Sequence, residues 1–111
     1  AAKKAALSLA ENGYTRPVER NDVEVLGNEG LGLVYVGAET MTSGNYMSEH
    51  DRVISEKLGW VMSGGDLSYP QKVSEKYLLS LERKAFLELC TTRKTLERLQ
   101  SMVKSGKILR N

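Results

Sequence analysis

The chain has 111 residues, of which 41% are hydrophobic and 27% charged, and its formal net charge is +2. This length allows one domain with a modest core, and the composition excludes disorder of the whole chain. The small net charge does not by itself indicate nucleic acid or an anionic membrane as a partner. Cys90 is the single cysteine, so no internal disulfide can form, and we expect a cytoplasmic location.

The two ends of the chain and its apolar runs bear on its context. No apolar run approaches the roughly 18 residues that a membrane span needs, and there is no signal peptide. The first residues, AAKKAALSLAEN, read as the middle of a helix. We therefore expect residues 1–111 to form a single helical domain that is a fragment of a longer chain.

The first predicted helix spans residues 2–12, which are rich in Ala and Leu, and Gly13 ends it. Residues 18–26 follow a turn at Pro17 and alternate valines with charged residues. Because no neighbouring segment could pair with a lone strand, we predict a loop there. The second predicted helix, over residues 29–42, takes Asn28 as its N-cap.

The third predicted helix spans residues 49–63, because Ser48 and Asp51 form an S-x-x-D capping signal at its start. Gly64 and Gly65 end it, and residues 66–72 are predicted to form a surface loop.

Ser74 is expected to cap a fourth helix over residues 75–90. A fifth helix, over residues 94–105, is expected to stop at Gly106. The whole pattern predicts an all-α fold, a small array of about five helices. The fifth helix should turn inward its apolar residues Leu96, Leu99, Met102 and Val103.

Candidate catalytic and metal-binding residues are few. His50 is the only histidine, and its neighbours Glu49 and Asp51 leave a helix in different directions, so no metal site is expected. Cys90 lies at a helix end, where the dipole disfavours a thiolate, so it is interpreted as a packed structural thiol. Gly27, Gly30 and Gly32 give G-x-x-G-x-G, which is not the dinucleotide fingerprint. We therefore expect no catalytic residue in this chain.

The last part of the chain is basic. Two interpretations stay open: an anion site for nucleotide phosphate or nucleic acid, or a solvated helix face with favourable charges at its C-terminal end. The cations are Arg93, Lys94, Arg98, Lys104, Lys107 and Arg110, against Glu97.

Three stretches carry a family resemblance: YMSEHD (residues 46–51), VSEKYLLSLERKAFL (73–87), and KTLER (94–98) running on to the final GKILRN (106–111). Together they resemble the extreme C-terminus of bacterial and archaeal fusion proteins. In these proteins an NAD-dependent 3-hydroxyacyl-CoA dehydrogenase precedes an enoyl-CoA hydratase/isomerase (crotonase-like) domain. Lys84 stands where the usual pattern has Glu, and Ile108 where it has Pro.

This resemblance implies a parent enzyme, an oxidoreductase of fatty-acid β-oxidation, that binds NAD and acyl-CoA. The parent's catalytic groups would lie upstream, leaving this fragment without a cofactor of its own. By analogy with crotonase tails, Lys104, Lys107 and Arg110 are candidate contacts to CoA phosphates. The expected partners are the upstream dehydrogenase and crotonase-like domains, and a homo-oligomer, because helices meant to cover another domain would expose apolar stripes.

Two other functions are weighed against this one. A small basic helical nucleic-acid-binding domain would use the basic tail and would show steep salt dependence. A self-standing enzyme would show turnover by the chain alone, and none is expected.

Overall fold

The computed structural model describes all residues, 1–111. The five predicted helices are confirmed, each to within one residue at either end. The elements are, in order, α1 (Ala2–Glu11), β1 (Val23–Val25), α2 (Asn28–Ser43), α3 (Glu49–Met62), β2 (Gln71–Val73), α4 (Glu75–Leu89) and α5 (Arg93–Ser105).

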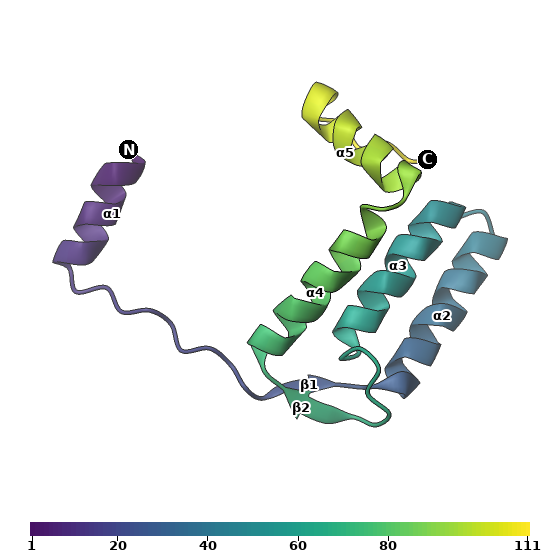
Figure 1. Ribbon diagram of the computed structural model, residues 1–111, viewed down its shortest axis with the longest axis horizontal. Coiled ribbons are helices and arrows are strands. Elements are labelled where there is room, and N and C mark those ends of the chain that lie inside the picture. The colour runs from purple at the N-terminus through teal and green to yellow at the C-terminus, as the bar shows by residue number, and fades with distance from the viewer.

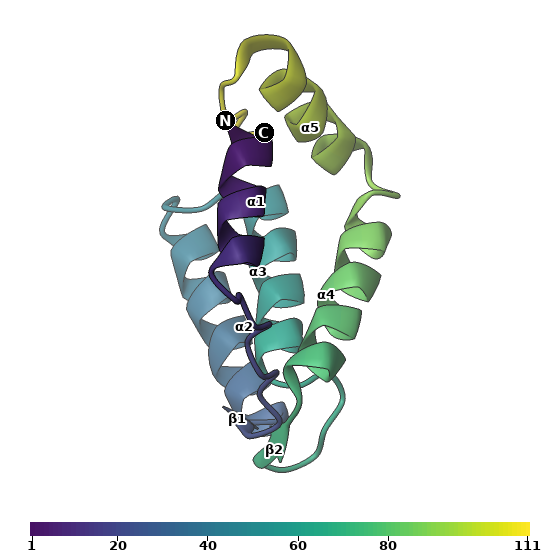
Figure 2. The same cartoon turned by 90° about the vertical axis from the view of Figure 1, so that its left-hand side faces the viewer.

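The elements form one layer of helices with a small sheet at its base. Helices α2, α3 and α4 stand side by side, the β1–β2 pair lies at one end of them, and α5 lies at the other end (Figures 1 and 2). Helix α1 stands apart from this body on an extended connector. No helix is both long enough and apolar enough to cross a membrane.

The prediction of two loops at residues 18–26 and 66–72 is wrong in part. Strands β1 and β2 pair antiparallel, with Val23 opposite Val73 and Val25 opposite Gln71. The partner of β1 follows two intervening helices, so nothing near β1 in the sequence reveals it. Pairing buries Val25, which is only 2% exposed, and thereby closes the base of the helical layer.

The N-cap of α2 also differs from the prediction, since it is Gly27 rather than Asn28. Gly27 has a φ of 66°, and a Cβ there would lie 2.8–2.9 Å from backbone atoms of Leu67 and Tyr69. Only glycine tolerates both the left-handed backbone and this close approach. The backbone N–H groups of Gly27 and Asn28 donate to the carbonyls of Ser63 and Leu67, which ties α2 to the loop after α3.

The predicted caps of the later helices are confirmed. Ser48 Oγ accepts from the Asp51 N–H at 3.1 Å, and Asp51 Oδ2 accepts from the Ser48 N–H at 3.2 Å, which completes a capping box. Ser74 Oγ accepts from the N–H of Tyr77 at 3.1 Å. Gly106 adopts the left-handed conformation that ends α5.

The apolar core is small and lies between α3 and α4. Val61, Leu81 and Ala85 are buried, and Trp60, Tyr77 and Leu78 pack against them half-buried. No large side chain is fully buried, so most of the apolar surface of these helices is uncovered.

The prediction that α5 turns its apolar face inward is wrong. Leu96 is 47% exposed and Val103 is 87% exposed, and Thr95 is the one buried residue of the helix. The apolar residues of α5 do lie on one face of the helix, as the sequence pattern predicts, but no element of this chain covers that face. The exposed apolar face of α5 consists of Leu96, Leu99, Met102 and Val103.

Candidate functional site

A polar junction joins the start of α3 to α5. Asp51, in the first turn of α3, accepts a hydrogen bond at Oδ1 from Arg98 Nη1 at 2.8 Å. The two side chains are only 20% and 17% exposed, so this ion pair is largely shielded from water. Since Asp51 Oδ2 serves the capping box, one carboxylate both starts α3 and holds α5 against it.

His50 forms the second contact of the junction. Its side chain is 4% exposed, and Nε2 lies 2.8 Å from Thr95 Oγ1, within hydrogen-bond distance. The sequence interpretation left His50 as a surface or packing residue, and the structure shows that it packs. Thr95 Oγ1 also accepts from Thr92 Oγ1 at 2.8 Å, so the bond is part of a short chain of hydroxyls at the start of α5.

The C-terminal residue closes the junction from the other side. Asn111 Oδ1 accepts from Arg98 Nε at 2.6 Å, and Asn111 Nδ2 donates to the Lys94 carbonyl and to Glu97 Oε2, both at 3.0 Å. The tail after Gly106 therefore folds back along α5 and ends beside its start (Figure 1).

The junction joins the first and the third of the three stretches that carry the family resemblance, while residues 73–87 lie in β2 and α4 and contribute nothing to it. The YMSEHD stretch supplies Ser48, His50 and Asp51, KTLER supplies Thr95 and Arg98, and the final residues supply Asn111. The sequence showed these stretches as separate patterns. The structure gives them one shared role, which is to fix α5 and the tail on α3.

The pKa values of both titratable groups of the junction, Asp51 and His50, are lowered. The hydrogen bond from Arg98 holds the pKa of the Asp51 carboxyl below its ordinary value, against the raising effect of burial. Burial lowers the pKa of His50, and the cations Arg98 and Lys94 lower it further, while Asp51 opposes them. His50 is therefore neutral in the folded protein at pH 7.

This shift predicts a pH dependence of folding. With a folded pKa below the ordinary 6.5, the unfolded chain binds the His50 proton more readily, so the free energy of unfolding falls as the pH drops below about 6.5. The contribution is present in full above that value. Urea unfolding at pH 8 and pH 5 should show a loss of stability that His50→Gln reduces. An equal loss in the variant would assign the effect to other groups.

The three candidate phosphate contacts differ in their surroundings. Arg110 folds back toward α3, with Nη2 3.9 Å from Asp51 Oδ2, whereas Lys104 is in the last turn of α5 and Lys107 follows Gly106. Both lysines are exposed and neither is part of an ion pair of 4 Å or less. Their ammonium groups are thus available to an anion, while the guanidinium of Arg110 lies near Asp51.

An apolar groove, which the sequence did not predict, runs between α3 and α4. Its volume is about 730 Å³, and nine of its 12 lining residues are hydrophobic. The helical periodicity showed apolar stripes on both helices but could not show that they stay uncovered. The groove is lined by Ile54, Leu58, Val61 and Met62 of α3, by Leu78, Leu79, Ala85, Phe86 and Leu89 of α4, and by Lys57, Glu75 and Glu82.

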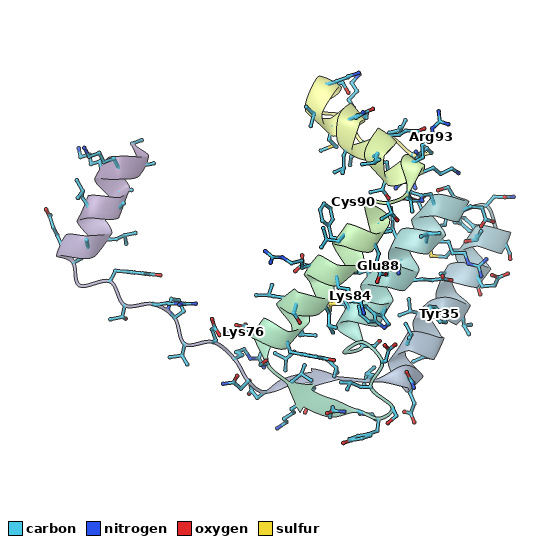
Figure 3. The ribbon with its side chains drawn as sticks, viewed as in Figure 1. Tyr35, Lys76, Lys84, Glu88, Cys90 and Arg93 are labelled. Carbon is cyan, nitrogen blue, oxygen red and sulfur yellow. The ribbon has the colours of Figure 1, made fainter.

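A smaller polar cluster links α3 and α4 around Trp60. Lys84 Nζ lies 5.5 Å from the centroid of the Trp60 ring, and Trp60 Nε1 donates to Asp66 Oδ1 at 2.9 Å. Lys57 pairs with Glu88 across the two helices, and Figure 3 shows Lys84 and Glu88 on neighbouring turns of α4. A lysine at position 84 thus contributes a cation–π contact within this fold.

Neither of the other candidate residues is part of a reactive site. Cys90 is the C-cap of α4, half-buried, beside the break that leads to α5 (Figure 3). The glycines of G-x-x-G-x-G lie at the cap and within α2, where Gly30 packs against Leu26 and Ser63. Gly27 and Gly30 thus allow a close approach of neighbouring segments, whereas Gly32 meets nothing within 4 Å.

Comparison with known proteins gives one clear similarity. Over 110 residues, 99% of the chain, the sequence is 43% identical to a Bacillus subtilis (strain 168) protein described as a probable 3-hydroxyacyl-CoA dehydrogenase. The chain spans 14% of the length of that protein. No protein-family model matches the chain, and no solved structure matches it. The similarity supports the dehydrogenase part of the family resemblance, while the fused hydratase stays a prediction.

Proposed function

We propose that this chain is a helical module of an NAD-dependent 3-hydroxyacyl-CoA dehydrogenase of fatty-acid β-oxidation, one that also carries a crotonase-like hydratase domain. The observation that carries the proposal is the 43% identity along 99% of the chain to the Bacillus subtilis protein. NAD and the acyl-CoA substrate would bind the remainder of such an enzyme. The module's own tasks would be packing, subunit contact and capture of CoA.

The polar groups of the junction support a packing role. The His50 ring and both Asp51 carboxylate oxygens are engaged with neighbours on α3 or α5, which leaves these two groups poorly placed to exchange a proton with a substrate. Arg98 binds Asp51 and Asn111, while its Nη2 is buried without a partner. The exposed apolar face of α5 supports the same role, because monomeric proteins rarely leave so continuous an apolar stripe in water. We propose that the rest of the enzyme covers this face.

A chimera tests the proposal. In it, the matched 110 residues of the Bacillus subtilis protein are replaced by this chain. The chimera should oxidise a 3-hydroxyacyl-CoA with NAD at a rate within about tenfold of the unaltered protein. This limit corresponds to a change of about 1.4 kcal/mol in the activation barrier. A version lacking the segment should lose activity. A folded chimera no more active than this truncated version would contradict the proposal.

CoA capture is tested separately, in the folded chimera. A ligand that binds only the folded state at about 100 times its Kd stabilises by about 2.7 kcal/mol. CoA should therefore raise the Tm, and 3′-dephospho-CoA should raise it less, because Lys107 would lose a phosphate partner. Lys107→Glu should reduce the difference between the two ligands. Lys76→Glu is the matched control, since Lys76 is an exposed lysine of α4 away from the tail (Figure 3), and a similar reduction there would argue against a specific site.

A further inference from the structure

Helix α1 has no partner within its own chain. It is 10 residues long and none of them is buried. Its two leucines, Leu7 and Leu9, are more than half exposed, so α1 leaves apolar side chains without cover. The connector is fixed only at its far end, where Glu75 donates its N–H to the Arg20 carbonyl at 2.9 Å and its Oε2 accepts from the Arg20 N–H at 3.3 Å.

The sequence of α1 suits an apolar groove. At 3.6 residues per turn, Ala2, Ala5, Ala6 and Leu9 share one face, which is narrow because three of the four side chains are methyl groups. Such a face can approach two helices closely. Leu9 is 53% exposed, and its burial would give the largest single gain on docking.

The groove between α3 and α4 matches α1 in size and charge. A volume of about 730 Å³ accommodates the apolar side chains of a short helix. Its acidic lining residues, Glu75 and Glu82, are opposite in sign to Lys3, which flanks the apolar face of α1. Its one cation is Lys57.

The path of the connector favours a neighbouring molecule as the source of the helix. The connector is held at Glu75, at the end of the groove, and from there it leads α1 away from its own α4 (Figure 1). We propose that the α3–α4 groove binds the α1 helix of a second copy of this chain, and that two copies exchange these helices reciprocally. This inference deepens the subunit contact of the proposed function and rests on it.

Reciprocal exchange has an energetic consequence. A two-fold axis places two arms in two grooves, so one dimer buries the contact twice and leaves no open end for further growth. Leu7, which is 55% exposed, lies on the opposite side of α1 from this apolar face, so the contact would leave it uncovered.

Sedimentation of the chain and two α1 variants tests the proposal. The wild-type chain should be a dimer, Leu9→Glu should shift it to monomer with at least a tenfold weaker association, and Ser8→Glu should stay dimeric. Ser8 lies beside Leu9 in the sequence but on the polar face, so it is a matched control. Because no residue of α1 is buried, neither change should disturb the folded body, which circular dichroism verifies.

A mixing experiment separates exchange from other modes of association. Leu79→Glu places a charge in the groove at a side chain that is 63% exposed, so it should also give monomers. Mixing it with Leu9→Glu should restore heterodimers, since one intact arm then meets one intact groove. A dimer that survives Leu9→Glu, or no heterodimer on mixing, would overturn the exchange while leaving a subunit contact in place. A monomeric wild-type chain would overturn both.

Discussion

Asp51→Ala is expected to lower the free energy of unfolding by about 2–3 kcal/mol. Removing one partner of a buried ion pair costs about 3–5 kcal/mol, and the pair with Arg98 lies toward the lower side because both groups keep about a fifth of their surface exposed. Loss of the capping box adds to the effect. Denaturant unfolding at pH 7 measures it.

Glu49→Ala is the control for this change. Glu49 is in the same first turn of α3 but is exposed, so its removal should alter stability by no more than about 0.5 kcal/mol. Arg98→Ala should cost about as much as Asp51→Ala, and the double variant should cost far less than the sum, because the two side chains share one interaction. Additive losses would show that the two residues do not act together.

Gly59→Ala is the second change with a large expected effect, about 1–3 kcal/mol of destabilisation. A Cβ at Gly59 would lie 2.5 Å from Val34 Cγ1 and 2.9 Å from Val34 Cβ, and a β-branched side chain has little freedom to move aside in a helix. Helices α2 and α3 would have to separate. Thermal unfolding should register the loss as a drop in Tm.

Two further variants give this prediction a matched contrast. Gly37→Ala, in α2, meets nothing within 4 Å, so it should stabilise by up to about 1 kcal/mol through helix propensity alone. Val34→Ala combined with Gly59→Ala should recover part of the loss, because the added methyl then has room. A destabilised Gly37→Ala, or no recovery in the double variant, would argue against the close approach of α2 and α3.

Local signals in the sequence predict the helices well. Ser48, Ser74 and Gly106 mark helix ends through bonds made within a few residues, which is why periodicity and capping locate all five helices to within one residue. The β1–β2 pair could not be predicted in this way, because Val23 is in a strand only through its pairing with Val73, which follows two intervening helices in the sequence. The N-cap of α2 could not be predicted for a similar reason. The backbone carbonyls that leave no room for a Cβ at Gly27 belong to the loop after α3.

The candidate site is less accessible to sequence reasoning. The sequence identifies Asp51 as a cap and Arg98 as one cation among several, but it cannot reveal that they meet. The inward orientation expected for Leu96 and Val103 is wrong because periodicity shows which face is apolar, not whether anything covers it.

We infer that His50 and Asp51 hold α3, α5 and the tail together and take no part in the reaction of the parent enzyme. The most direct test is the chimera described above, with His50→Gln or Asp51→Ala introduced, assayed at a temperature where each variant is folded. We expect a lower Tm with kcat within about threefold of the unaltered chimera, since no transition-state contact is lost. An unchanged Tm with kcat reduced by about a thousandfold would instead show that the substituted residue takes part in catalysis.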